Sequence, residues 1–392
     1  MKAQHQGRGA AYYLTHAVPA ATSPLDMTLA QWLNFWLEHY IRPNKKPAGF
    51  AQYKDLCTGH IIPEIGEIPL RDITGPILQL FFNEQSEHGN LKTGGPLSAK
   101  SIKNMRVLLD VAFRVAVEKN GMGANPVRDT VIPAVHRHAV VPLTEEMQKE
   151  LERFLFADDN LQNMGILLAL YTGCRLGEIC ALRWVDIDTD KNELHLRQTV
   201  KRLPREVSDG GPATALTFSG IKGSQPMRIV PIPPVVERLL AFQRARAEEK
   251  FRGKAVGVAG YPTEYVVYNR NGQLTDPDNL SHYFGEVLTK IGLPHARYHD
   301  LRHTFSCRAI ENGMDILTLS GLLGHADVRT TEQFYLHPRL AAMRRAMQTI
   351  VPEEKGLTFA LPGAHVRDKS TQRTSAGTVS QNVLTSYKHK TA

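Results

Sequence analysis

The chain has 392 residues, of which 42% are apolar, with 47 lysines and arginines against 39 acidic residues. This length allows two or three domains with cores of ordinary size. The net charge of +8 and the pI of about 9.2 fit a polyanionic partner, but also a basic enzyme without one. No apolar run is long enough for a membrane span, and the N-terminus lacks the pattern of a secretory signal. Four scattered cysteines without CxxC spacing predict a reduced, cytoplasmic protein with no zinc knuckle.

The first part of the chain predicts a short arm followed by a helical domain. Residues 1–24 are too few and too polar to bury a core, so we expect a flexible arm. Residues 25–127 have helical periodicity. Thr28 and Ser98 are expected to cap helices, and Gly121 to end the longest one. Another helix is predicted from Ala48 to His60, ending before Pro63.

The longest predicted helix has an apolar face and an opposite basic face. Its basic face carries Lys100, Lys103, Arg106 and Arg114. A basic helical face is often only a solvated surface, and that interpretation stays open here. The alternative is a ridge that lies along a phosphate backbone, where lysine and arginine supply the affinity.

A basic linker is expected at 128–142, followed by a second domain at 143–350 and a largely disordered tail at 351–392. Thr144 begins the second domain as a helix cap. Strands are predicted at 184–198, 216–221 and 227–232 from their β-branched residues and turns. Because the strands are grouped together between helices, the pattern predicts an α+β domain rather than a parallel βαβ sheet.

Two segments of the second domain supply arginines. Arg175 follows a helix that ends at Thr172-Gly173, and Glu178 could hold its guanidinium or cap the next helix. If 299–303 is helical, His299 and Arg302 share a face and point at a common target. Arginine is the natural ligand for a phosphate in a site without metal, since it stays charged and offers a planar fork of donors. The competing interpretation is a metal site made by three histidines spaced by four residues: His295, His299 and His303.

Three more residues complete a candidate site for phosphodiester cleavage. His325 follows Gly324 at the end of a predicted helix, and Tyr335 lies ten residues later. Lys222 lies in a predicted turn between two strands, a mount from which a lysine could protonate a leaving oxygen. Each alone has an ordinary alternative: a helix-capping histidine, a half-buried tyrosine or an exposed lysine. The functional interpretation depends on the whole set.

These residues stand in motifs that resemble the tyrosine recombinase (phage integrase) family, notably "YTGCRLGEICALRW", "RIVPIP", "HDLRHTF" and "LLGHADVRTTEQFY". The N-terminal segment "HIIPEIGEIPLRDIT" resembles the core-binding domain of that family. The likeness covers about residues 25–350 and is strongest to integrases of phages and conjugative transposons. It implies an all-α core-binding domain and a mostly helical α+β catalytic domain with a small antiparallel sheet. Residues 1–24 are too short for the folded arm-binding domain with which many larger relatives begin.

The resemblance also implies roles for the residues. Arg175 and Arg302 would clamp the scissile phosphate, His299 and His325 would assist, and Lys222 would be the general acid. Tyr335 would attack to give a 3′-phosphotyrosyl enzyme. The implied protein is a bacterial, nucleoid-associated site-specific recombinase that needs neither metal nor ATP and has no other cofactor. Its implied partners are double-stranded DNA, three further copies of itself in a tetramer, and an excisionase or DNA-bending host protein.

Three rivals share parts of this pattern. One is a catalytically silent relative that only occupies DNA sites, and another is a topoisomerase-like enzyme that relaxes DNA with the same chemistry. The third is a metal-dependent hydrolase that uses the three histidines at 295, 299 and 303. A covalent adduct, exchanged DNA ends and activity in excess EDTA would separate the integrase from them in turn.

Overall fold

The computed structural model of the protein describes residues 24–135, 142–205, 213–221, 227–252, 264–325, 327–328, 331 and 347. The chain divides into a compact unit, Met1–His337, and a second unit, Pro338–Ala392, in which only Met347 is described. The predicted arm up to residue 23, the linker at 136–141 and the tail at 351–392 therefore lie outside the described residues. Lys222 and Tyr335 lie outside them as well.

The N-terminal helical part begins with α2 (Leu29–Trp36), which starts at Thr28 as predicted. The Thr28 hydroxyl accepts a hydrogen bond from the backbone of Gln31 at 3.3 Å, and the Gln31 side chain accepts one from the backbone of Thr28 at 3.0 Å. This reciprocal cap satisfies two N–H groups that the first helical turn leaves free. The helix buries Trp32 and Trp36 completely and continues into one π-helical turn, Leu37–Ile41.

The second predicted helix is longer than the sequence pattern indicated. Helix α3 (Pro47–Leu56) passes through a π-helical turn, Cys57–Ile61, into α4 (Ile62–Ile65), so the expected end before Pro63 is wrong. Pro63 lies in the first turn of α4, where its missing N–H leaves no bond unmade. Pro63 therefore lies at the start of the next helical segment and does not end the helical run.

Helices α5 (Gly75–His88) and α6 (Ala99–Asn120) complete this part. Ser98 caps α6 by accepting from the backbone of Ser101 at 3.1 Å, and Gly121 ends it at a φ of 75°. Both ends match the prediction. Short helical turns precede α2 at Pro24–Asp26, join α4 to α5 at Leu70–Asp72, and follow α6 at Pro126–Asp129. The predicted apolar face of α6 is buried in the core: Ile102, Met105, Leu109, Ala112, Phe113 and Ala116.

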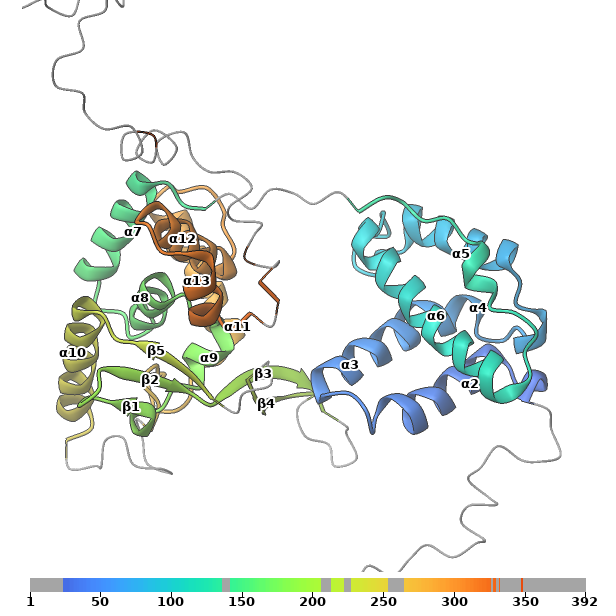
Figure 1. Cartoon of the computed structure of the whole chain (residues 1–392), viewed down its shortest axis with the longest axis horizontal. Helices are drawn as coiled ribbons and strands as arrows, with labels where there is room; N and C mark the ends of the chain where they lie inside the picture. The colour runs from blue at the N-terminus through green and yellow to red at the C-terminus, as the bar shows by residue number, and fades with distance from the viewer. Residues whose placement is uncertain are drawn as a thin grey trace, which may run out of the picture. The chain divides into compact units, whose positions relative to one another are not determined.

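The part of the chain that follows the gap at 136–141 is built around α8 (Asn163–Thr172), whose apolar residues are buried on all sides. Helix α7 (Glu145–Ala157) precedes it, capped by the predicted Thr144. Figure 1 shows α12 (Tyr298–Glu311) beside α8, and α13 (Ile316–Leu323) packs against α12. The buried Tyr298 hydroxyl donates to the Gly165 carbonyl at 2.5 Å and so joins α12 to α8. The remaining helices among the described residues are α9 (Leu176–Cys180), α10 (Pro234–Lys250) and α11 (Pro277–Lys290).

Two small antiparallel sheets complete the described fold (Figure 1). One has the order β1-β2-β5 and the other pairs β3 with β4. The predicted strand at 184–198 is wrong in detail, because a helical turn (Trp184–Asp186) and a chain reversal at Asn192 divide it. The observed strands are β1 (Ile187–Asp188), β2 (Glu193–Leu196), β3 (Gln198–Pro204), β4 (Thr214–Gly220) and β5 (Arg228–Pro231).

The predicted fold class is confirmed: a helical N-terminal part and a mostly helical α+β part with small antiparallel sheets. Each part has its own buried apolar cluster among the described residues, one between Leu29 and Val127 and the other between Leu143 and Leu301. In the described part of the chain, no helix is both long enough and apolar enough to cross a membrane.

Candidate active site

A glycine turn places Arg175. Helix α8 ends at Gly173, whose φ of 64° lies in the left-handed region that favours glycine. A methyl group at this position would also lie 2.5 Å from a ring carbon of Phe305. The chain then enters α9 with Arg175 as the residue before its first turn. The Thr-Gly-Cys-Arg sequence therefore directs the Arg175 side chain by local backbone geometry.

Glu178 holds two arginines at once. Its carboxylate accepts from the Arg175 guanidinium at 2.9 Å and from the Arg175 backbone N–H at 2.9 Å, so it does both things the sequence offered as alternatives. The oxygen that accepts from the Arg175 backbone, Oε2, also pairs with Arg228, the first residue of β5. Glu178 is only 2% exposed. Burial alone would raise the pKa of this carboxyl, but Arg228 and Arg175 lower the pKa below its ordinary value.

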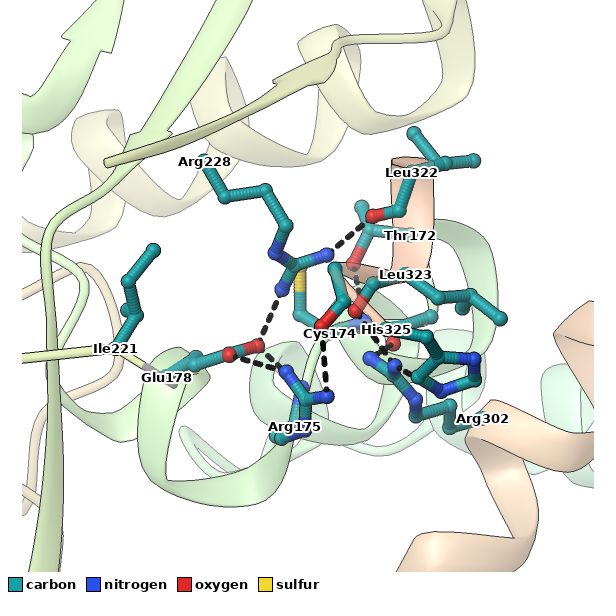
Figure 2. Close-up of polar contacts among 12 residues, drawn as sticks. Thr172, Cys174, Arg175, Glu178, Ile221, Arg228, Arg302, Leu322, Leu323 and His325 are labelled. Atoms are coloured by element: carbon teal, nitrogen blue, oxygen red, sulfur yellow. Dashed lines mark hydrogen bonds and ion pairs between the residues drawn. The ribbon is translucent and has the colours of Figure 1, made fainter. Parts of the chain in front are cut away.

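The end of α13 gathers three guanidinium groups. Figure 2 shows Arg175, Arg228 and Arg302 around the last carbonyls of this helix. Carbonyls at a helix C-terminus lack partners within the helix and carry partial negative charge, so they favour cations. Three consecutive carbonyls each accept from a different arginine: Leu322 from Arg228, Leu323 from Arg302 at 2.6 Å, and Gly324 from Arg175 at 3.3 Å.

Arg302 is the most buried of these arginines, with 3% of its surface exposed. It also donates to the Gly173 carbonyl at 2.7 Å, so one side chain joins the end of α8 to the end of α13. Burial, with smaller contributions from Arg175 and Arg228, lowers the pKa of Arg302 to about 9. The guanidinium therefore stays charged at neutral pH, but at a cost that a bound anion would relieve.

His325 contacts Arg302, and the contact fixes its tautomer. Arg302 can only donate, so the Nε2 atom of His325 accepts this hydrogen bond of 3.0 Å. The proton of the neutral ring is then on Nδ1, which donates to the Thr331 hydroxyl at 2.8 Å. Burial and the nearby arginines lower the pKa of His325 to about 4. His325 is therefore neutral at pH 7 in the protein without DNA.

His299 lies one turn before Arg302 on α12, as the sequence predicted. The surrounding protein atoms, and then the Arg302 charge, lower its pKa. The rings of His299 and His303 meet edge to face with centroids 4.8 Å apart. His295 precedes α12 and is exposed, and the ligand atoms of these three histidines do not gather around one point. The metal interpretation of the three histidines therefore has no support in the geometry.

The arrangement of β4 and β5 corrects the expected mount of Lys222. The two strands were predicted to flank a turn, but β4 pairs with β3 and β5 pairs with β2. Residues 222–226 therefore join strands of two different sheets. The sequence could not show this, because the turn signals at 222–226 look the same for a hairpin and for a crossing between sheets. Lys222 and Tyr335 themselves lie outside the described residues.

The predicted DNA-binding residues share α6 but differ in their contacts. Lys100, Lys103 and Arg114 are exposed, and Arg114 lies 3.7 Å from Asp110. Arg106 is half-buried and donates to the Thr130 hydroxyl and the Val127 carbonyl. Part of its donor capacity therefore binds the turn that follows the helix.

Sequence reasoning missed two residues of the site. Arg228 was not among the predicted site residues, although it begins the motif "RIVPIP", and its inward position on a strand that was predicted correctly is the signal that could have found it. Thr331 was not among them either, although it is completely buried and its hydroxyl contacts His325. We call Arg175, Arg228 and Arg302 with Glu178 the arginine cluster. Its net charge is +2, because it has three guanidinium groups and one carboxylate and the nearby histidines are neutral.

Comparisons with known proteins agree with this fold. The sequence pattern described as the phage integrase family matches residues 143–341, and that of the phage integrase N-terminal SAM-like domain matches residues 28–85. The chain belongs to the phage integrase family. It is a site-specific tyrosine recombinase of the mobile-element type, an enzyme that cleaves and rejoins DNA. The resemblance inferred from the sequence motifs is thereby confirmed.

Curated relatives and solved structures support the same grouping. A XerC-like tyrosine recombinase of Caldanaerobacter subterraneus is 28% identical over 339 residues, covering 83% of each chain. The transposase of transposon Tn916 from Enterococcus faecalis is 28% identical over 65% of this chain and 63% of its own. The Tn1549 integrase in complex with transposon right end DNA has the same fold, with a TM-score of 0.65 and 22% identity over 83% of this chain and 99% of that one. A lambda integrase tetramer bound to a Holliday junction matches with a TM-score of 0.55 and 18% identity over 83% of each chain.

Proposed function

We propose that this recombinase cleaves DNA through Tyr335, with Arg175 and Arg302 holding the scissile phosphate. The phenolate oxygen attacks phosphorus, the bond to the 5′ oxygen breaks, and a 3′-phosphotyrosyl enzyme forms. Lys222 gives its proton to the departing 5′ oxygen, and His299 and His325 assist at the phosphate. The domains are proposed at 25–127 for core-site DNA binding and 143–350 for catalysis, with 128–142 as the linker.

The observation that carries this proposal is the convergence of the guanidinium groups at the end of α13. Each guanidinium has five N–H donors. Among the described contacts, Arg175 uses two of them and Arg302 uses three, so both retain donors for a further anion. A phosphodiester brings one negative charge and an attacking phenolate brings a second. The net charge of +2 on the arginine cluster matches that sum and favours the transition state over the bound ground state.

The same charge explains how a tyrosine can act at neutral pH. A tyrosine with its ordinary pKa near 10 is almost entirely a neutral phenol at pH 7. Nearby cations stabilise the phenolate and make it a better nucleophile. Because the phosphodiester bond energy is stored in the tyrosyl ester, a free 5′ hydroxyl can reverse the attack on the same or another strand. Religation then needs no ATP, and the arginines take the role that metal ions have in other nucleases.

The proposed partners are double-stranded DNA and copies of the same chain. We infer a homotetramer that exchanges strands between two duplexes through a Holliday junction, in integration or excision of a mobile element, in the bacterial cytoplasm. The lambda integrase tetramer on a Holliday junction supports this assembly by analogy of fold. An excisionase or a DNA-bending host protein would bias the direction. Lys100, Lys103, Arg106 and Arg114 of α6 are proposed to contact the DNA backbone, with Arg106 contributing less because it also binds its own fold.

A covalent trap tests the nucleophile. The protein is incubated with a nicked attachment-site duplex, with and without excess EDTA, and adducts that survive denaturation are counted. We expect an adduct with the wild type that EDTA does not remove, and none with Tyr335→Phe. Tyr171→Phe is the matched control, because Tyr171 lies four residues before Arg175 and burial raises its pKa. An adduct formed equally by Tyr335→Phe, or abolished by EDTA, would contradict the proposal.

A further inference from the structure

Arg228 occupies a position that a strand normally gives to an apolar residue. It begins β5 (Arg228–Pro231), which pairs with β2 so that Arg228 lies opposite Leu196. Residues of a strand alternate between two faces, and Val230 on the same face is 1% exposed. Arg228 is itself only 7% exposed. A charged residue at such a position costs free energy unless it is paired and hydrogen-bonded.

The contacts of Arg228 join three elements of the catalytic part. Its two terminal nitrogens pair with the Glu178 carboxylate on α9 and with the Leu322 carbonyl on α13 (Figure 2). Its side chain also lies so close to Gly324 that a methyl group there would be 2.6 Å from Cδ of Arg228. Arg228 therefore has the same two neighbours that Arg175 has, Glu178 and the end of α13.

Arg228 is not one of the two arginines to which the proposed function assigns the phosphate. Its terminal nitrogens bind Glu178 and the Leu322 carbonyl, which lie beside the groups that hold Arg175 and Arg302. It instead acts on what they contact. Two guanidinium groups pull the Glu178 carboxylate from two sides, which fixes the carboxylate and, through it, the Arg175 fork.

Stability alone is a poor reason for such an arrangement. A buried ion pair often adds little to the free energy of unfolding compared with apolar residues of similar volume. The Arg228–Glu178 pair directly contacts Arg175 and does not lie elsewhere in the core. A misplacement of a catalytic group by about 1 Å can slow a reaction by about 100-fold. Exact placement of Arg175 and Arg302 is therefore a stronger reason than stability to retain a charge at this position.

We propose that Arg228 is a positioning residue for strand cleavage, which holds Glu178 and the end of α13 so that Arg175 and Arg302 address one phosphate. This inference rests on the proposed function of those two arginines. It also assigns a purpose to the three consecutive carbonyls at the end of α13. They hold the arginine cluster in its working arrangement before DNA binds, and the phosphate then takes the donors that remain.

The test separates DNA binding from cleavage. Single-turnover formation of the Tyr335 adduct is measured at saturating nicked duplex, and the dissociation constant is measured in parallel. For Arg228→Met we expect cleavage slower by about 100-fold with affinity changed by less than about threefold. Arg228→Lys keeps the charge but cannot hold both partners, so it should fall between Met and the wild type.

Arg308 offers a matched control. Like Arg228, it joins a carboxylate and a backbone carbonyl, donating to Glu311 at 2.7 Å and to Leu143 at 3.0 Å, but it lies outside the arginine cluster. Arg308→Met should lower the thermal unfolding midpoint while the folded protein cleaves at nearly the wild-type rate. If Arg228→Met unfolds the protein, the double variant Arg228→Met/Glu178→Gln removes the unpaired buried carboxylate as well. Its cleavage rate is then compared with that of Glu178→Gln alone.

The outcomes are distinct. If Arg228 acts through Glu178, the loss from Arg228→Met should be much smaller in the Glu178→Gln background than in the wild type. Cleavage by Arg228→Met within a few-fold of the wild type, or a loss that only follows affinity or the folded fraction, would overturn the inference. Absence of a Tyr335 adduct from the wild type would instead overturn the proposed function itself.

Discussion

Replacing Glu178 by Gln tests the electrostatic balance of the arginine cluster most simply. The substitution keeps the shape of the side chain but removes the carboxylate that pairs with two guanidinium groups of the cluster, those of Arg175 and Arg228. Three N–H donors converge on its two oxygens, two from Arg175 and one from Arg228. An amide has one oxygen, so at least one of these donors would face another N–H group.

The expected loss follows from where the two arginines lie. Arg175 is 27% exposed in its side chain and can be partly solvated, but Arg228 is 7% exposed and cannot. Removing one member of a buried ion pair costs about 3–5 kcal/mol, because the other charge is left uncompensated. We expect a loss of about 3 kcal/mol in the free energy of unfolding, at the lower end of that range because water can reach Arg175.

Urea unfolding at pH 7, followed by circular dichroism, measures this loss, and Glu150→Gln is the control because its partner Arg153 is 76% exposed. Glu178 has a lowered pKa in the folded protein, so its contribution is present above the ordinary carboxyl pKa and is lost as the pH falls through the lower folded value. Glu178→Gln should flatten that part of the stability profile. A change of less than about 1 kcal/mol at pH 7 would refute the reasoning, since this is the range of a surface pair.

Three further predictions concern other parts of the site. Gly324→Ala should cost about 1–3 kcal/mol in the free energy of unfolding, because of the φ of 64° at this position and its contact with Arg228. Gly321→Ala on α13 is the control and should not lower the free energy of unfolding, because the added methyl group meets no atom within 4 Å. Equal stability of the two variants in urea would contradict this prediction. Lys103→Ala and Arg114→Ala should each reduce the slope of log K against log salt by about 0.9 in DNA-binding titrations, and unchanged slopes would mean that this face does not meet DNA. NMR titration should find the pKa of His325 at about 4 in the protein without DNA. A bound duplex should raise this pKa, since a phosphate stabilises the imidazolium. A pKa near 6.5 in the free protein that DNA does not change would be inconsistent with the Arg302 contact.

Local signals in the sequence predicted the helix ends well. Thr28, Ser98, Gly121 and Thr144 act within one turn of chain, so their hydrogen bonds and backbone angles depend on few neighbours. The family motifs also predicted that distant arginines belong to one site, and the structure brings Arg175 and Arg302 together with His325.

The errors arose where tertiary pairing decides the structure. Residues 184–198 contain enough β-branched and apolar residues for one strand, but turn contacts at Asp188 and Lys191 reverse the chain between two strands. The strands on either side of Lys222 pair with other strands, which no local pattern shows. Arg228 was overlooked because the sequence alone does not distinguish a buried arginine from an exposed one. Only the packing of three elements around it shows that it is buried.

The most direct test of the catalytic proposal is to identify the residue that carries the DNA. After cleavage of a nicked duplex, nuclease and trypsin treatment should leave a nucleotide remnant on the peptide 330–339, TTEQFYLHPR, whose only tyrosine is Tyr335. We predict that mass spectrometry finds the added phosphate on this peptide, attached at Tyr335. A remnant on any other peptide, or a cleaved duplex with no peptide attached, would contradict the account of how this recombinase breaks DNA.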